Sequence, residues 1–166
     1  MRAFRLASLL VFCVAVATVT PIDPARGEEP LPYDVPLPPV SWLLPPDPEV
    51  EGKVGGFSGA WAGEWRTFGS RSFVQVNHVL VVESVYPDHV IIAFAWGKSS
   101  MSEDMKRPGW VQAFGWTANG ALATRLPNGA TVTYTLENNG ALRGVWVQDD
   151  IIAHAILRRA KISARP

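Results

Sequence analysis

The sequence predicts an all-β protein, an eight-stranded antiparallel up-and-down barrel, and two features carry this prediction. Three Asn-Gly steps begin at Asn119, Asn128 and Asn139, 9 and 11 residues apart. Asn and Gly accept the positive φ angles of tight hairpin turns, so each step between β-type segments indicates a hairpin. The segments between these turns alternate apolar and polar residues, as in Thr131–Leu136. Because hairpins join only antiparallel neighbours, a meander of strands is expected.

Eight segments qualify as strands, and together they fill a barrel domain expected at 55–160. Pro87, Pro108 and Pro127 all fall between these segments, where a sheet tolerates a residue without an N–H donor. Eight sequential strands expose two edges unless the first pairs with the last, so a closed barrel is expected. The expected strands are 59–67, 73–86, 89–96, 110–117, 121–126, 131–136, 141–147 and 151–157.

The N-terminus has the pattern of a secretory signal peptide. Two arginines precede an apolar run over 6–17, which ends in the small-x-small sequence Ala15-Val16-Ala17. We therefore expect cleavage of residues 1–17 and a secreted or periplasmic mature chain. The run is too short for a membrane anchor, and no later run is long enough for a transmembrane segment. Cys13 lies inside the signal, so the mature chain is expected to have no disulfide.

A proline-rich linker is expected at 18–54. Residues 21–48 hold ten of the 14 prolines. Proline removes the donor that sheet and helix interiors need, which favours a disordered, extended tether that acts as a spacer. The alternative is a ligand for a proline-recognising module. The apolar island 40–44 could pack back onto the barrel, and residues 161–166 are expected to form a C-terminal tail.

Charge and motifs exclude several classes of function. Fifteen basic residues balance 15 acidic ones, so nothing indicates a nucleic-acid partner. No Gly-x-Ser-x-Gly motif occurs, and Asp149-Asp150 is explained by turn chemistry, so we do not expect an enzyme. His78, His89 and His154 lie on different segments without carboxylates at fixed spacing, so no metal site is expected. No motif identifies a cofactor.

The aromatic residues indicate where a ligand would bind. Alternation places Trp110, Phe114 and Trp116 on one face of the fourth strand. An eight-stranded barrel can be filled by such side chains or hold one small ligand, and the sequence leaves both possibilities open. Small residues such as Gly63 and Gly144 favour free volume. The expected ligand-binding residues are Trp61, Trp65, His78, Trp96, Trp110, Phe114, Trp116, Tyr134 and Trp146.

Both ends of the barrel sequence resemble the calycin superfamily, which includes lipocalins and avidins. The chain opens its first strand with Gly59-Ala60-Trp61 and ends its last strand with Arg158-Arg159. The resemblance implies a barrel in which a basic residue packs across the tryptophan and closes one end. We therefore expect Trp61 to pack beside Arg158 or Arg159. Barrel closure is assigned to Gly59, Trp61 and Arg158, because alternation places Arg158 on the same face as Ile152, His154 and Ile156.

The connection 97–109 is the one long loop expected after the second strand. It is polar, has glycine at both ends and shows no strand alternation. Long loops in compact domains are usually functional or disordered. Met101 and Met105 are adaptable apolar groups that could cover a barrel mouth. We therefore hypothesise a lid, with a solvated loop of no particular role as the alternative.

Two functions follow from the sequence. The first is an exported binding module for a small apolar or aromatic-stacking ligand. The second is a structural or inhibitor-like accessory domain at the cell envelope, with a packed, ligand-free barrel. The expected partner is accordingly an unknown small molecule or an envelope protein.

Overall fold

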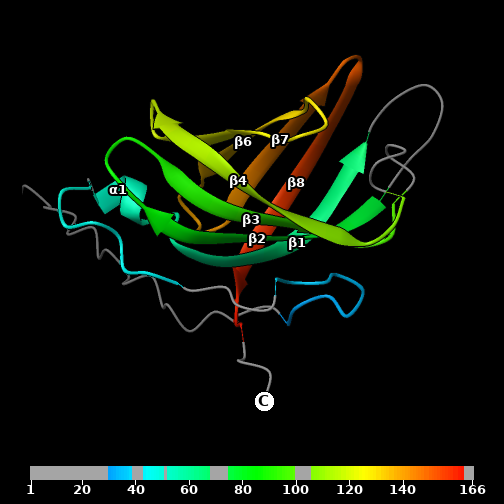
Figure 1. Cartoon of the computed structure of the whole chain (residues 1–166), viewed down its shortest axis with the longest axis horizontal. Coiled ribbons are helices and arrows are strands. Elements are labelled where there is room, and N and C mark those ends of the chain that lie inside the picture. The colour runs from blue at the N-terminus through cyan, green and yellow to red at the C-terminus, as the bar shows by residue number, and fades with distance from the viewer. Residues whose placement is uncertain (1–29, 39–42, 51, 68–74, 100–105, 163–166) are drawn as a thin grey trace, which may run out of the picture.

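The computed structural model describes residues 30–38, 43–50, 52–67, 75–99 and 106–162. In this part of the chain, eight antiparallel strands in sequential order form one closed barrel, which confirms the expected fold class (Figure 1). Each expected strand is present, with its ends within three residues of the expected bounds. The strands are β1 (Gly59–Thr67), β2 (Gln75–Val85), β3 (Val90–Trp96), β4 (Gly109–Ala118), β5 (Ala121–Arg125), β6 (Thr131–Leu136), β7 (Leu142–Gln148) and β8 (Ile151–Ala160).

One short helix, α1 (Gly52–Gly55), precedes β1. Within the described ranges no helix has the length and apolar character needed to cross a membrane. The expected signal peptide at 1–17 and the lid residues Met101 and Met105 lie outside the described residues, so both remain predictions.

Closure depends on the pairing of the first strand with the last. β1 and β8 are antiparallel and run in register from Ala60 opposite Ala160 to Thr67 opposite Ala153. This pairing satisfies the backbone N–H and C=O groups that both edges would otherwise expose. The seam therefore turns an eight-stranded sheet into a barrel.

The Asn-Gly steps all make turns, but not the same turn. Asn119 and Gly120 have φ angles of 52° and 74°, the two positive values that a two-residue type I′ hairpin requires. At Asn128 and Asn139 only the following glycine is positive. Each of these asparagines instead accepts, through Oδ1, the backbone N–H two residues later, at 3.2 and 3.0 Å. The loops at Asn128 and Asn139 are longer than the turn at Asn119, and each needs one left-handed residue rather than two.

The barrel interior is an apolar core that is closed at the end next to α1. Phe57 is buried there, and Val50 and Val54 pack against the same core. The largest fully buried side chains of the core are Phe57, Trp61, Trp65, Phe94, Tyr134 and Trp146.

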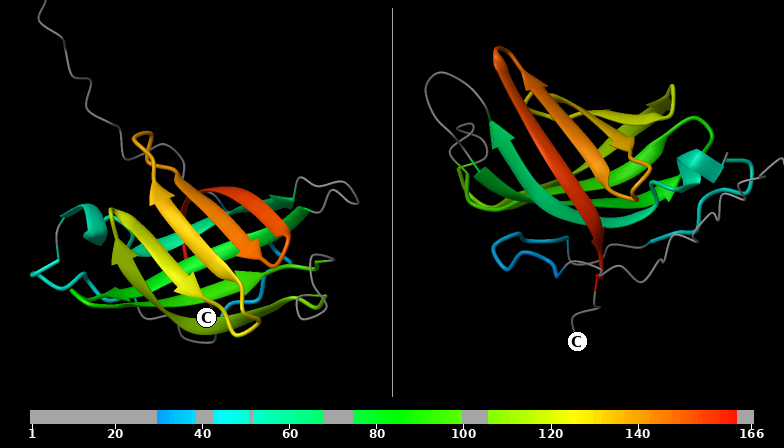
Figure 2. Two further views of the ribbon diagram at one scale, coloured as in Figure 1. Left: turned by 90° about the horizontal axis from the view of Figure 1, so that it is seen from above. Right: turned by 180° about the vertical axis from the view of Figure 1, so that it is seen from behind.

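The proline-rich stretch is not a free spacer where the structure describes it, which corrects the expectation of a disordered tether. Leu31, Val35 and Leu37 pack on the outer face of β1, β2 and β3. The segment 30–38, drawn in blue, runs along the outside of the barrel (Figures 1 and 2). Asn77 Nδ2 donates to Asp34 Oδ1 at 2.8 Å, which fixes the segment to β2. The segment packs because the outer face is apolar at this position. Its buried outer-face residues are Ala60, Ala62, Val79, Val81, Ala93, Ala95 and Ala160.

Candidate ligand-binding site

Five aromatic side chains meet in the middle of the barrel and form the ring cluster: Trp65, His78, Phe94, Tyr134 and Trp146. The ring centroids of His78 and Phe94 lie 4.2 Å apart, and those of Trp65 and Trp146 lie 6.2 Å apart with their planes at 69°. Four of the five were expected at the ligand site. The structure brings these four together, and they fill the centre of the barrel instead of surrounding an empty one.

Gly144 explains why this packing is possible. A Cβ atom at this position would lie 2.7 Å from the Trp65 ring and 3.2 Å from the Tyr134 ring. The glycine therefore makes room for aromatic neighbours, and the expectation that it leaves free volume is wrong.

His78 is fully buried and hydrogen-bonded at both ring nitrogens. Its Nδ1 lies 2.7 Å from the carbonyl oxygen of Ala95. A carbonyl can only accept, so Nδ1 carries the proton, and Nε2 accepts from the Tyr134 hydroxyl at 3.0 Å. Burial lowers the pKa of His78 to about 3 and raises the pKa of Tyr134 well above its usual value. At neutral pH the pair is therefore an uncharged structural link.

A pocket of about 440 Å³ opens at the end of the barrel opposite α1, and we call it the mouth pocket. Its walls come from the end of β3, the start of β4, the β5–β6 turn and the end of β7. Successive strands alternate in direction, so these elements all meet at one end of the barrel. The lining residues are Phe94, Trp96, Val111, Leu126, Pro127, Asn128 and Trp146.

The mouth pocket exists because β4 presents little bulk to the interior. Its inward positions include Val111 and Ala113, whereas Trp110, Phe114 and Trp116 point outward and are 42%, 71% and 45% exposed. These three aromatics therefore do not line the interior of the barrel, and their expected role in ligand binding stays a prediction for the outer face. Alternation shows which residues share a face but not which face is inside. Here, rings from other strands already occupy the centre.

Trp96 lies at the rim of the mouth pocket. Its side chain is partly buried against the core, and Nε1 donates to the carbonyl oxygen of Arg107 at 2.8 Å. The described end of the β3–β4 connection thus fixes the orientation of this indole. Trp96 lines the mouth pocket, and its expected role in ligand binding stays a prediction.

Trp61 is not at the mouth pocket but under the seam of β1 and β8. The guanidinium carbon of Arg159 lies 3.9 Å from its ring centroid, and Arg159 also donates to the carbonyl oxygens of Ser58 and of Gly56, the latter at 2.6 Å. Gly59, with φ of 113°, leaves space for this guanidinium. The expected closure by a cation over Trp61 is present, and Gly59 takes part.

The closing cation is Arg159 and not the expected Arg158. Leu157 is buried inside the barrel, whereas Ile152 and Ile156 are about half exposed on the outer face. Alternation therefore puts Arg159 on the inner face and Arg158 on the outer one. The expectation assumed that Ile152 and Ile156 point inward, but Ala153, Ala155 and Leu157 do.

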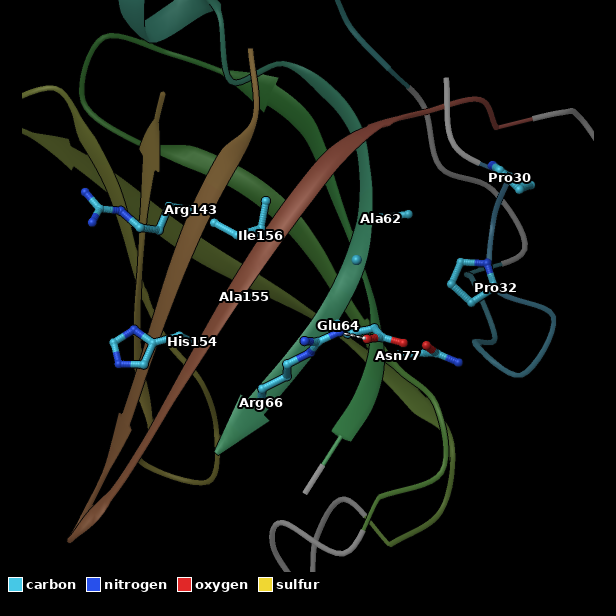
Figure 3. Close-up of a pocket in the computed structure, with 11 residues that line it drawn as sticks. Pro30, Pro32, Ala62, Glu64, Arg66, Asn77, Arg143, His154, Ala155 and Ile156 are labelled. Atoms are coloured by element: carbon cyan, nitrogen blue, oxygen red, sulfur yellow. Dashed lines mark hydrogen bonds and ion pairs between the residues drawn. The ribbon is translucent and has the colours of Figure 1, made fainter. Parts of the chain in front are cut away.

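A second depression lies on the outside of the barrel, between the proline-rich segment and β8 (Figure 3). Figure 3 shows Pro30 and Pro32 on one side and Arg143 and His154 on the other. Its charged groups are engaged with neighbours. Arg66 lies 3.0 Å from Glu64, and Arg143 lies 2.8 Å from Glu137.

The carboxylate in this depression is not poised for acid–base chemistry. Hydrogen bonds from Gln75 and then from Arg66 lower the pKa of Glu64, so it stays ionised. Within the described ranges, no three His, Cys, Asp or Glu side chains are grouped so as to hold a metal ion. Nothing in this depression brings a nucleophile and a base together.

Sequence reasoning missed several residues of the mouth pocket. Phe94 could have been found, because alternation places it on the same strand face as Trp96. The β5–β6 turn residues Leu126, Pro127 and Asn128 carry no such signal, because a turn's contribution to a cavity depends on where the barrel brings it.

Comparisons with known proteins identify no family for this chain. No protein-family model matches it, and no curated protein matches its sequence. Among solved structures it is similar to a de novo designed fluorescence-activating β-barrel, with 16% identity and a TM-score of 0.48. The alignment covers 66% of this chain and 99% of the design. A likeness at this level carries no argument about ligand or function.

Proposed function

We propose that this chain is a small-molecule binding protein that takes an apolar or aromatic ligand into the mouth pocket. The observation that carries the proposal is an apolar pocket of about 440 Å³ at the one barrel end that the described core leaves open. Its volume falls within the range of roughly 300–1,000 Å³ that is typical of small-molecule sites. The partner is then a small molecule. We propose that the protein is a calycin-like binding barrel.

The character of the walls supports the same class of ligand. Phe94, Trp96 and Trp146 line the pocket, so much of its wall is aromatic and suits an apolar or aromatic molecule. The other rings of the ring cluster lie below and give the pocket a rigid floor, because His78 and Tyr134 hold each other by a hydrogen bond. A preformed site of this kind loses little entropy on binding. We propose binding without chemical conversion, since no activated nucleophile or base lies among these residues.

We also propose that the protein is exported. The basic start, the apolar run and the small-x-small sequence at Ala15-Val16-Ala17 support cleavage before residue 18. N-terminal sequencing of protein collected from the periplasm or medium tests this. A mature chain that starts beyond residue 27, or an uncleaved chain, would contradict cleavage after Ala17.

Titration with the neutral fluorescent probe N-phenylnaphthylamine tests the binding function. The unaltered protein should bind the probe and increase its emission. Val111→Trp should abolish binding, because the larger side chain fills the mouth pocket from β4. Val147→Trp, at a half-exposed site on the outer face of β7, is the matched control and should bind normally. Absence of probe binding by the unaltered protein would contradict the proposal.

The outer face of β4 favours a second candidate, an interaction protein. Trp110, Phe114 and Trp116 form an outer stripe of aromatic side chains over roughly 20 Å of strand. Exposed apolar stripes of this size often mark contact surfaces. An envelope protein would then be the partner, and the mouth pocket would have no ligand. Unchanged probe behaviour in Val111→Trp would favour this candidate.

A further inference from the structure

Gly109, the first residue of β4, is not explained by its own backbone conformation. The described glycines with a positive φ are Gly59, Gly120, Gly129 and Gly140, and Gly109 is not among them. In a strand, a glycine loses more entropy on folding than other residues do and offers no side chain to pack. Such a glycine often marks a place where another group comes close.

The group that comes close is the Trp96 indole. Trp96 and Gly109 face each other in the register of β3 and β4. A Cβ atom at position 109 would lie 2.8 Å from Cζ2 of the indole and 3.3 Å from Cε2. Both distances are shorter than the optimal separation of about 3.5–4.0 Å between carbon atoms. A side chain at position 109 would therefore push the indole away from β4.

Two further contacts fix the same indole. Its Nε1 donates at 2.8 Å to the carbonyl oxygen of Arg107, which lies just before Gly109 in the chain. The Phe94 ring packs beside it, with ring centroids 6.2 Å apart. The short stretch that leads into β4 thus holds the indole by a hydrogen bond and also leaves the space in which it lies.

The indole is one of two walls that limit the width of the mouth pocket. The inward side chains of β4 behind the pocket have little bulk, as Val111 and Ala113 show. The strand order places the β5–β6 turn, with Leu126, on the other side of β4 from Trp96. Gln148 Nε2 holds this turn by donating to a carbonyl oxygen within it at 3.0 Å. Both walls are therefore held in place by the protein itself.

We propose that Gly109 is a specificity-determining residue of the mouth pocket and that it acts through Trp96. By leaving room for the indole at the start of β4, Gly109 fixes the wall that sets an upper limit on the size of the ligand. The inference rests on the proposed binding function and deepens it, because it assigns size selection among apolar ligands to one pair of residues.

Two uncharged hydrocarbons of different size, naphthalene and the larger pyrene, test the role of the indole. Binding is followed by quenching of tryptophan emission. Trp96→Phe provides a shorter ring and should raise the affinity for pyrene relative to naphthalene about fivefold, as expected for a small change in the volume of an apolar pocket. Trp110→Phe, at an exposed site on the outer face of β4, is the matched control and should leave this ratio unchanged.

Gly109→Ala tests whether the glycine holds this wall. The added methyl group should displace the indole and weaken naphthalene binding about fivefold or more, a coupling typical of residues in contact. The double variant Gly109→Ala/Trp96→Phe should bind naphthalene within about twofold of Trp96→Phe alone, because the shorter ring leaves room for the methyl group. A glycine needed only for the stability of β4 would not show this rescue. Gly52→Ala, where nothing lies within 4 Å of the added Cβ, should bind normally.

The outcomes separate this inference from the function on which it rests. If the unaltered protein binds neither hydrocarbon, the proposed function fails and the inference fails with it. If Gly109→Ala binds naphthalene as tightly as the unaltered protein, or if its loss persists in the double variant, the binding function stands and the role of Gly109 is overturned. If Gly109→Ala does not fold, the size preference decides, and an unchanged ratio in Trp96→Phe overturns the inference.

Discussion

The guanidinium of Arg159 lies over the Trp61 ring, with its central carbon 3.9 Å from the ring centroid. The two residues face each other in the register of β1 and β8, so the contact lies on the seam that closes the barrel. Arg159 also donates to the backbone before β1, at Gly56 and Ser58. One side chain therefore joins the last strand to the first strand and to the segment that leads into it.

Arg159→Ala should destabilise the barrel. A cation over an indole contributes about 0.5–1 kcal/mol at an exposed site. The two backbone hydrogen bonds add to this, and partial exposure limits them, so we expect a loss of about 1–2 kcal/mol in the free energy of unfolding. Urea denaturation measures it. Arg158→Ala is the matched control on the outer face and should cost less. Equal losses would show that Arg159 does not close the seam.

Acid should destabilise the protein through His78. Burial lowers the pKa of this imidazole to about 3 from an ordinary value of 6.5, so the unfolded chain binds a proton that the folded chain rejects. The contribution of neutral His78 to the free energy of unfolding is complete above pH 6.5 and is lost as the pH falls toward 3. The slope should approach about 1.4 kcal/mol per pH unit in this window.

Denaturation at a series of pH values checks the slope. The clearest range lies above about pH 5, where most carboxylates are still ionised. His78→Gln cannot titrate and should give a flatter profile, at the cost of lower stability at neutral pH. A His78→Gln profile as steep as that of the unaltered protein would contradict the assignment.

Gly144→Ala should disturb the ring cluster. The new methyl group would lie 2.7 Å from the Trp65 ring, and neither the backbone nor the packed rings can move far. Overpacking of this kind costs about 1–3 kcal/mol, which thermal or urea denaturation would detect. Gly52→Ala, where nothing lies within 4 Å of the added Cβ, is the control and should be neutral. Full tolerance at Gly144 would mean that the centre of the barrel is loosely packed.

Phe114→Ser should leave folding nearly unchanged. The side chain is 71% exposed on the outer face of β4, so little buried area is lost, and the change in unfolding free energy should stay within about 0.5 kcal/mol. Retention on a phenyl-substituted column should fall, because the outer stripe loses its most exposed ring. Phe94→Ser, inside the ring cluster, should by contrast unfold the protein. Strong destabilisation by Phe114→Ser would place that ring inside the barrel.

The strands could be predicted because the signals that define them are local. The Asn-Gly turns, the prolines between strands and the alternation in Thr131–Leu136 all act over a few residues, and the barrel follows from the need to pair two edges. The contact between Trp61 and a basic residue of the last strand is what the resemblance of Gly59-Ala60-Trp61 to the calycin superfamily implies.

The direction of each face could not be predicted in the same way. On β4 the aromatic residues point outward, and on β8 Ile152 and Ile156 do, because rings from β1, β3, β6 and β7 already fill the centre. Whether Phe114 or Ala113 faces inward therefore depends on the volume left by other strands. For the same reason, nothing local in the sequence marked Leu126 and Pro127 as pocket residues.

Contacts between a bound probe and named side chains test the central claim most directly. Intermolecular NOEs from bound N-phenylnaphthylamine to the unaltered protein should connect the probe to Trp96 and Val111, which line the mouth pocket. NOEs to Trp110, Phe114 and Trp116 instead would place the ligand on the outer stripe and contradict binding at the barrel mouth.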